Sequence, residues 1–300
     1  MQAQLYDYSL IGGDLRQVFL AEELARPYSR LCHYALCGEP EKSRCAPSAS
    51  LTPAASLAEL CHSSPNIICP IPLSRDGITL NQSGLEEEIS LRQLLDQLQP
   101  DQHFFAGSIP ADFQKTARAR GIYVHDLMED AALAWFNTLA TAEGAICEAI
   151  ISSPINLHKS HCLILGYGKC GKALAQYLKG MFCCLDILTD DVAEQAQASL
   201  TANRTGALVD MEKQISDYDF IFNTVPALIL TAPLLEKAKP GVTIIDIASA
   251  PGGVDFPTAR KLNLTAKSAL GLPGKYAPAS SARGISAAIK TILKEKTKCL

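Results

Sequence analysis

Residues 160–171 read SHCLILGYGKCG. An apolar run, 162–165, leads directly into Gly166, Gly168 and Gly171, which have the spacing G-x-G-x-x-G. This order predicts a buried strand, a tight turn and the start of a helix. The first glycine allows the turn, the second lets a diphosphate approach the backbone, and the third lets the helix pack closely against the strand. The pattern therefore indicates a dinucleotide-binding α/β domain.

The other cofactor contacts are expected in the loops after neighbouring strands, because ligands of open α/β sheets bind at the carboxyl ends of the strands. Two such loops, 223–226 and 248–253, follow apolar segments and contain small residues that can lie along a nicotinamide ribose. Turns without a ligand would need Gly and Pro in the same way. The predicted contact residues are Gly166, Tyr167, Gly168, Lys169, Cys170, Gly171, Thr189, Asp190, Asp191, Thr224, Val225, Pro226, Ala248 and Ser249.

An acidic pair, Asp190 and Asp191, ends the next apolar segment, 183–189. Asp190 stands 24 positions after Gly166, where a carboxylate can accept hydrogen bonds from the adenine-ribose hydroxyls and repel a 2′-phosphate. This feature favours NAD over NADP. In the alternative interpretation Asp191 caps the following helix and Asp190 is only solvated.

The composition excludes several classes of protein. With 300 residues and 48% hydrophobic content the chain can build two cores. A net charge of −4 and the lack of a long basic run argue against nucleic-acid binding. No apolar stretch has the roughly 20 residues of a membrane span, and the N-terminus lacks a secretory pattern. The eleven cysteines have no metal-ligand spacing, so we expect a reduced, cytoplasmic protein without a metal site.

The first half of the chain alternates strand-like and helix-like segments, which predicts a parallel sheet covered on both faces. A stretch rich in Pro, Ser and Ala, 39–55, is interpreted as a long loop. The expected strands are 8–11, 31–37, 67–71, 103–106 and 122–125, and the expected helices are 15–25 and 113–120.

We therefore predict two Rossmann-like doubly wound parallel-sheet domains with an interdomain cleft. Residues 1–134 form an N-terminal α/β domain on the substrate side, 135–155 a linking helix, and 156–280 the NAD(P)-binding domain. The second domain has further strands at 220–224, 242–247 and 264–269, and a last helix, 281–296, is expected to pack back on the first domain.

Two arginines of the first domain, Arg16 and Arg75, follow predicted strands and would face the cleft. Their planar guanidinium groups suit a dicarboxylate substrate, which they can bind in bidentate fashion. In the alternative interpretation both form structural ion pairs, Arg75 with Asp76 and Arg16 with Glu22 or Glu23.

The apolar helical stretch 131–151 is interrupted near 141–144, TAEG. Glu143 is a candidate general base. Alternatively Thr141 caps a new helix, and Glu143 is favourable in its first turn because of the helix dipole. Among the histidines, only His125 is expected near the cleft.

Taken together, the motifs resemble the family of dipicolinate synthase A subunits. The resemblance extends over nearly the whole chain and includes Asn137. The matching stretches are IGGDLRQ (11–17), PIPLSRDG (70–77), FAGSIP (105–110), TAEGA (141–145), GYGKCG (166–171), NTVP (223–226), DIASAPGGVDF (246–256) and GLPGKYAP (271–278).

The resemblance implies a fold like that of 2-hydroxyacid and alanine dehydrogenases. It also implies NAD(P)-dependent oxidation of a dihydrodipicolinate-type ring from the lysine pathway to dipicolinate during sporulation. The resemblance further implies that the protein acts with a separate B subunit of dipicolinate synthase, in the mother cell of a spore-forming bacterium. We also expect a homo-oligomer. The positions that match the motifs are assigned as substrate-binding (Arg16, Ser74, Arg75 and Thr141) and as catalytic (Glu143 and Asn137).

The chain also departs from the family pattern. Ala140 stands where relatives often carry Pro, and several relatives carry Arg at the position of Asp190, which favours NADP; the cofactor is therefore written NAD(P). Two other functions remain as alternatives: a 2-hydroxyacid or amino-acid dehydrogenase, and a non-catalytic dinucleotide-binding partner of the B subunit.

Overall fold

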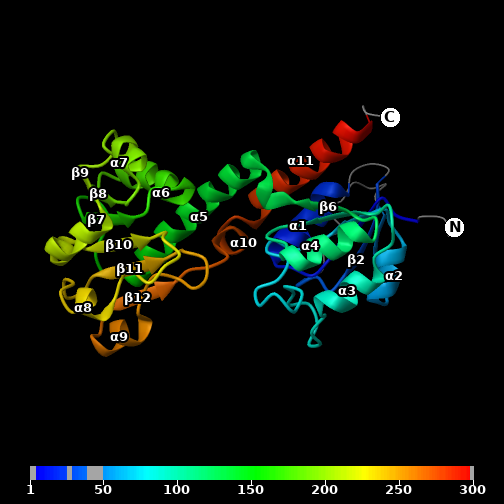
Figure 1. Cartoon of the computed structure of the whole chain (residues 1–300), viewed down its shortest axis with the longest axis horizontal. Helices are drawn as coiled ribbons and strands as arrows, with labels where there is room; N and C mark the ends of the chain where they lie inside the picture. The colour runs from blue at the N-terminus through cyan, green and yellow to red at the C-terminus, as the bar shows by residue number, and fades with distance from the viewer. Residues whose placement is uncertain (1–4, 26–28, 39–49, 298–300) are drawn as a thin grey trace. The chain divides into compact units, whose positions relative to one another are not determined.

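The computed structural model describes residues 5–25, 29–38 and 50–297. The chain divides into two units, each with its own sheet (Figure 1). The N-terminal unit comprises Met1–Phe136 with Pro278–Leu300, and the C-terminal unit comprises Asn137–Ala277. The division falls within helix α5, Ala131–Ser152. Among the described residues, no helix is both long and apolar enough to cross a bilayer.

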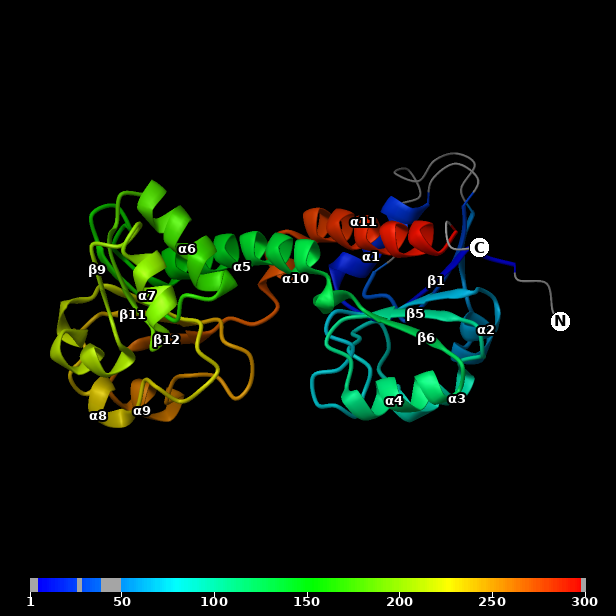
Figure 2. The ribbon, with the colours of Figure 1, turned by 45° about the horizontal axis from the view of Figure 1, so that its top comes forward.

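The sheet of the N-terminal unit is parallel throughout and has the order β3-β2-β1-β4-β5-β6. Helices α1 and α11 cover one face and α2, α3 and α4 cover the other (Figure 2). The elements are β1 (Tyr8–Ile11), α1 (Leu15–Leu24), β2 (Arg30–Tyr34), β3 (Ser50–Pro53), α2 (Leu57–His62), β4 (Asn66–Ile68), α3 (Leu91–Gln97), β5 (His103–Ala106), α4 (Ala111–Ala119), β6 (Tyr123–Asp126), the 3-10 helix η1 (Leu127–Glu129) and α11 (Pro278–Thr297).

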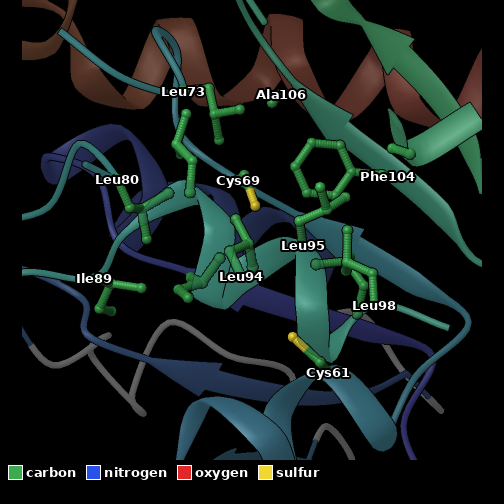
Figure 3. Packing of buried hydrophobic residues seen from close by; sticks show 14 of the residues in the cluster. Cys61, Cys69, Leu73, Leu80, Ile89, Leu94, Leu95, Leu98, Phe104 and Ala106 are labelled. Carbon is green, nitrogen blue, oxygen red and sulfur yellow. The ribbon is translucent and has the colours of Figure 1, made fainter. Parts of the chain in front are cut away.

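Because helices cover both faces of this sheet, its strands are apolar on both sides. In β5, Phe104 packs in the cluster with α2, α3 and α4, while the adjacent Phe105 packs on the opposite face with α1 and α11. Figure 3 shows the first cluster, in which Phe104 lies close to Leu95 and Leu98. This packing explains why the strands are short, continuous apolar runs rather than alternating ones.

The sheet of the C-terminal unit is also parallel and has the order β12-β11-β10-β7-β8-β9. Helices α5, α6, α7 and α10 contribute to the core on one face, and α8, α9, η2 and η3 to the core on the other. The elements after α5 are β7 (His161–Leu165), α6 (Lys169–Gly180), β8 (Cys184–Leu188), α7 (Val192–Ala198), β9 (Arg204–Gly206), η2 (Leu208–Lys213), η3 (Ile215–Asp217), β10 (Phe220–Asn223), α8 (Ala232–Leu235), β11 (Thr243–Asp246), α9 (Phe256–Lys261), β12 (Thr265–Ser268) and α10 (Leu272–Tyr276).

Counted within its own unit, each sheet has the strand order 3-2-1-4-5-6. The order reverses between β1 and β4 in the N-terminal unit and between β7 and β10 in the C-terminal unit. Ligands of doubly wound sheets bind outside the carboxyl ends of the strands at such a point. The predicted fold class, two Rossmann-like doubly wound parallel sheets, is confirmed, and the interdomain cleft stays a prediction.

One predicted loop contains a strand. The stretch 39–55 includes β3, which pairs in parallel with β2 and places Leu51 opposite Leu31; residues 39–49 lie outside the described residues. Pro53 is the last residue of this edge strand, where a missing backbone donor is tolerated. The composition that suggested a loop is therefore compatible with an edge strand.

The predicted interruption of the linking helix is wrong, because α5 is continuous over Ala131–Ser152. Thr141 does not cap a new helix; its hydroxyl donates to the carbonyl oxygen of Asn137, one turn earlier, at 2.8 Å. Gly144 is there for packing: a Cβ would lie 2.9 Å from both Leu272 Cβ and Tyr276 Cδ2 of α10. A glycine that suggested a helix end instead allows the close approach of another helix.

The last helix, α11, begins at Pro278 rather than at residue 281 and packs against α1 in the N-terminal unit. The sequence interpretation did not include the short edge strand β9, which pairs with β8.

Candidate functional site

The glycine-rich loop between β7 and α6 depends on two close approaches. Gly166 has a φ of +85°, and a Cβ there would lie 2.5 Å from Thr224 Oγ1. A Cβ on Gly171 would lie 2.3 Å from the carbonyl oxygen of Gly166. The first position needs glycine for its left-handed backbone conformation, and both need it for lack of space.

The middle glycine of the loop has a different environment. Gly168 is exposed, has a φ of −67° and is the N-cap of α6, whose N-terminus receives no side-chain cap. A Cβ at Gly168 would meet no atom within 4 Å. The first backbone N–H groups of this 12-residue helix therefore have no side-chain cap, and such an uncapped positive helix end is an arrangement that can bind phosphate. The residues present fit the diphosphate of NAD(P).

The other residues of the loop contribute in different ways. Tyr167 is 4% exposed and packs in the core, so only its backbone can line the loop. Lys169 is exposed, and Cys170 is half-buried. Burial raises the pKa of the Cys170 thiol, although Lys169 opposes this effect; the thiol is therefore protonated near neutral pH.

The acidic pair after β8 serves the local structure. Asp191 caps α7, because its Oδ1 accepts from the backbone N–H of Ala193 at 2.8 Å and of Glu194 at 3.0 Å. This agrees with the alternative interpretation for Asp191. Asp190 is exposed, but its Oδ1 accepts from the N–H of Leu208 at 2.9 Å, so it is not only solvated; its contact with a ribose hydroxyl stays a prediction.

Thr189 is buried, and its hydroxyl donates to Glu194 Oε2 at 2.8 Å. Its hydroxyl therefore links the end of β8 to α7, and its predicted contact with the cofactor stays a prediction.

The loops after β10 and β11 are connected to the glycine-rich loop. Thr224 donates to the carbonyl oxygen of Leu165 through both its backbone N–H and its hydroxyl, each at 2.9 Å. Val225 is half-buried, whereas Pro226 and Ser249 are exposed. Ala248 is 5% exposed, so any contact that it makes with a ligand would come mainly from its backbone.

The sequence interpretation placed Asn223 in the predicted cofactor loop 223–226 and Asp246 at the start of the motif 246–256, but it assigned neither residue a role of its own. They are the last residues of β10 and β11. The available signal was a polar residue at the end of each apolar strand.

In the N-terminal unit, Arg16 pairs with Asp14 and not with Glu22 or Glu23. Arg16 Nε donates to Asp14 Oδ1 at 2.9 Å, and Nη2 donates to Oδ2 at 2.7 Å and to the carbonyl oxygen of Ile71. Burial alone would raise the pKa of Asp14, but the hydrogen bonds and charge of Arg16, with a smaller contribution from Arg75, hold it below its usual value.

Asp14 also caps α1 by accepting from the backbone N–H of Arg16 at 3.0 Å. Helix α1 follows the first strand of its unit, as α6 does in the C-terminal unit, and a carboxylate caps its N-terminus. The N-terminus of α6 has no such side-chain cap, so of these two helices α6 is the one suited to a diphosphate.

The loop after β4 holds two other predicted substrate residues, Ser74 and Arg75. Arg75 is exposed and does not pair with Asp76, contrary to the alternative interpretation. Asp76 instead accepts from Ser74 Oγ at 2.8 Å and from the backbone N–H of Thr79 at 2.8 Å. These and other hydrogen bonds lower the pKa of Asp76. The Ser74 hydroxyl thus fixes the turn that carries Arg75.

The predicted catalytic residues lie at different levels of α5. Glu143 is exposed and accepts a hydrogen bond from Tyr177 OH of α6 at 2.9 Å. Burial, together with Glu143, raises the pKa of Tyr177. Tyr177 follows Gly168 by nine residues, roughly 13 Å along the helix axis, so Glu143 is held beside a later turn of α6 rather than beside the glycine-rich loop.

Asn137 precedes Glu143 by six residues in α5, roughly 9 Å along the helix axis, and is 8% exposed. Helices α5 and α6 both run from the carboxyl edge of the sheet toward its amino edge, since β7 follows α5 and precedes α6. Asn137 therefore lies nearer the level of the loop than Glu143 does. Arg16, Ser74 and Arg75 belong to the N-terminal unit, whereas Asn137, Thr141 and Glu143 belong to the C-terminal unit.

His125 pairs with another histidine: its Nε2 lies 3.0 Å from His103 Nδ1, and its ring stacks on Phe105 at 4.7 Å between centroids. Among the described residues, no group of three or more His, Cys, Asp and Glu side chains is arranged to hold a metal ion.

Comparison with known proteins first gives the class. Residues 140–252 match the family model described as the NAD binding domain of D-isomer specific 2-hydroxyacid dehydrogenase. A solved L-alanine dehydrogenase shares the fold with a TM-score of 0.62 at 12% identity, over 95% of this chain and 88% of that chain. The chain therefore has the fold of two-domain dehydrogenases, with an NAD-binding domain of the oxidoreductase type.

The match of the N-terminal unit gives a more specific resemblance. Residues 7–128 match the family model for the N-terminal domain of the dipicolinate synthase A subunit. The A subunit of dipicolinate synthase from Bacillus subtilis (strain 168) is 26% identical over 231 residues, 77% of this chain and 78% of that protein. The crystal structure of the Bacillus halodurans A subunit gives a TM-score of 0.81 at 22% identity, over 96% and 97% of the two chains. The chain is a relative of these dipicolinate synthase A subunits, and the resemblance expected from its motifs is confirmed.

Proposed function

We propose that this chain is the A subunit of a dipicolinate synthase and oxidises a dihydrodipicolinate-type ring to dipicolinate with NAD(P)⁺. The observation that carries the proposal is the open N-terminus of α6 at Gly168, in a chain that resembles dipicolinate synthase A subunits in both units. Association with a B subunit, action during sporulation in the mother cell and a homo-oligomeric state belong to the same proposal.

In the proposed reaction the main contribution of the protein is to position the substrate ring against the cofactor. The nicotinamide accepts a hydride when NAD(P)⁺ is bound, and formation of an aromatic ring favours the loss of that hydride and one proton. The residues of this chain then hold the cofactor and the ring at the right distance and orientation. Arg75 supplies a cation for a ring carboxylate, and Asp14 fixes the side chain of Arg16. Glu143 is less suited to accept the proton than its sequence position suggested, because Tyr177 holds it two turns away from the loop.

Dihydrodipicolinate supplied together with NAD⁺ or NADP⁺ tests the proposal directly. We expect reduced nicotinamide to form, as seen in its absorbance, with one of the two cofactors preferred. The assay is run with and without the B subunit. Cofactor binding without reduction under either condition would favour the non-catalytic partner, and reduction only with 2-hydroxy acids or amino acids would favour the other dehydrogenase function.

Replacing Arg75 with glutamine tests the substrate site. The variant Arg75→Gln is expected to raise KM for the dicarboxylate by about tenfold or more, because a hydrogen bond between a guanidinium and a carboxylate contributes about 1.5–3 kcal/mol. The Kd of NAD(P) should change by less than about twofold, since the cofactor is assigned to the other unit.

The matched control is Arg120→Gln, which removes the same charge from the N-terminal unit at a residue that binds Asp96. Effects of Arg75→Gln that do not exceed those of the control, or that change KM and Kd equally, would exclude Arg75 from the substrate site.

A further inference from the structure

Two buried polar side chains stand at the ends of β10 and β11, beside the loops assigned to the cofactor. Asn223 is 0% and Asp246 is 1% exposed, and they lie opposite one another in the register of the two strands. Asn223 Nδ2 donates to Asp246 Oδ1 at 2.8 Å. Burying a carboxylate and an amide costs free energy unless their polar atoms form hydrogen bonds. The other hydrogen bonds of the two side chains therefore show which parts of the backbone they hold in place.

Each remaining hydrogen bond of the pair reaches the backbone of one of these loops. Asn223 binds Val225 twice: Nδ2 donates to its carbonyl oxygen at 3.0 Å, and Oδ1 accepts from its N–H at 3.1 Å. Asp246 accepts from the N–H of Ala248 at 3.1 Å and of Gly253 at 2.9 Å. One side chain therefore fixes the loop 224–226, and the other fixes both ends of the loop 248–253.

The two loops are also pressed against each other. A Cβ on Gly253 would lie 2.1 Å from Asn223 Nδ2 and 2.9 Å from the carbonyl oxygen of Val225. The N–H of Leu230 donates to the carbonyl oxygen of Gly253 at 2.9 Å. Position 253 therefore needs glycine for space alone, and a shift of either loop would disturb the pair.

Thr224 continues the connection to the glycine-rich loop. Its hydroxyl donates to the carbonyl oxygen of Leu165 and occupies the space that a Cβ of Gly166 would need. A continuous series of hydrogen bonds and close contacts therefore connects the glycine-rich loop with the loop 248–253. It passes through Thr224, Asn223 and Asp246.

We propose that the Asn223–Asp246 pair positions the loops 224–226 and 248–253 for the nicotinamide half of the cofactor. Both are positioning residues, because their polar atoms bind the protein backbone and each other. The proposal rests on the proposed function, since it assigns the nicotinamide to these loops and the diphosphate to the glycine-rich loop. Loss of the pair would then weaken binding of the whole dinucleotide but leave its adenosine-diphosphate half bound.

The test compares two probes on the full chain by calorimetry, NAD(P)⁺ and ADP. The variant Asp246→Asn keeps the size of the side chain but puts an NH₂ group where an oxygen accepts N–H donors. We expect the Kd of NAD(P)⁺ to rise about tenfold or more, because a buried donor is left without an acceptor. The Kd of ADP should stay within about threefold of the wild-type value.

The control for a merely structural effect is Asp186→Asn, in β8 of the same unit. Asp186 is 5% exposed and binds Tyr218 OH and Arg204, away from both loops; this variant should leave both Kd values nearly unchanged. If Asp246→Asn does not fold, Asn223→Ser gives the same comparison, because it shortens the other member of the pair.

Equal losses of NAD(P)⁺ and ADP affinity, or an Asp246→Asn protein that binds NAD(P)⁺ as Asp186→Asn does, would overturn the positioning role. Wild-type protein that binds neither probe would instead overturn the proposed function itself, so the two failures are distinguishable.

Discussion

Valine in place of Gly168 is expected to weaken NAD(P) binding by at least about 100-fold while the C-terminal unit stays folded. The backbone at Gly168 has a φ of −67°, which any residue can adopt, and its Cβ would meet no protein atom within 4 Å. The new side chain would instead fill the space beside the first N–H groups of α6. Because hydrogen bonds to charged groups contribute about 1.5–3 kcal/mol each, the Kd should rise at least about 100-fold.

The matched control is Gly180→Val at the other end of α6, where a Cβ also meets nothing within 4 Å. Both variants add the same side chain to the same helix. Valine is less favourable than glycine at an N-cap but slightly more favourable than glycine within a helix, so both melting temperatures should stay within about 5 °C of the wild-type value. Titration calorimetry then separates them. Affinities of the two variants that agree within about threefold would place the diphosphate elsewhere on the chain.

The sequence was sufficient to predict this loop because all of its signals are local. The apolar strand, the spacing of Gly166, Gly168 and Gly171, and the helix after them occur within about two dozen residues. The same holds for the fold class: strands buried on both faces are short apolar runs, as Phe104 and Phe105 show by packing in opposite cores.

Features that depend on distant parts of the chain could not be predicted. Gly144 suggested a break in α5, and only the approach of Leu272 and Tyr276 of α10 explains it. Arg16 Nη2 likewise donates to the carbonyl oxygen of Ile71, which lies 55 residues further along the chain. In both cases the tertiary structure brings together groups that the local sequence does not connect.

The functional residues show the same limit. Glu143 was chosen because a carboxylate interrupts an apolar stretch, but the sequence could not show that Tyr177 would bind it. Asn223 and Asp246 were visible as polar ends of apolar strands. Their importance depends on the alignment of β10 with β11, which a single sequence does not supply.

Another buried carboxylate, Glu148, holds α5 to β12 and α10 within the C-terminal unit. Its side chain is 3% exposed. Lys267 Nζ and Lys275 Nζ each lie 2.5 Å from its oxygens, and Tyr276 OH donates at 2.7 Å. The two lysine side chains are 43% and 57% exposed. The carboxylate of Glu148 is therefore shielded from water, whereas the side chains of the two lysines are partly exposed to water.

This asymmetry predicts that removing the lysines costs more stability than removing the carboxylate. The double variant Lys267→Met/Lys275→Met leaves a buried carboxylate with Tyr276 alone, and we expect it to lower the free energy of unfolding by about 3 kcal/mol or more. Glu148→Gln lets both lysines turn toward water and should cost about 1 kcal/mol. Urea unfolding of the full chain near neutral pH measures both. The reverse order of the two costs would show that burial of the carboxylate is not the dominant energy.

The pH dependence of unfolding supplies the second half of this prediction. Burial alone would raise the pKa of Glu148, but hydrogen bonds from Lys267, Lys275 and Tyr276 lower it to about 2 from the ordinary 4.5. The stabilisation is therefore complete above about pH 4.5 and is lost as the pH falls toward 2. Without the lysines, burial raises this pKa, so the double variant should gain stability relative to wild type as the pH falls from 7 to about 4. The control Glu143→Gln, an exposed position on the same helix, should stay within about 0.5 kcal/mol of wild type throughout. A constant difference between the double variant and wild type over this range would mean that the charge of Glu148 is not what the two lysines stabilise.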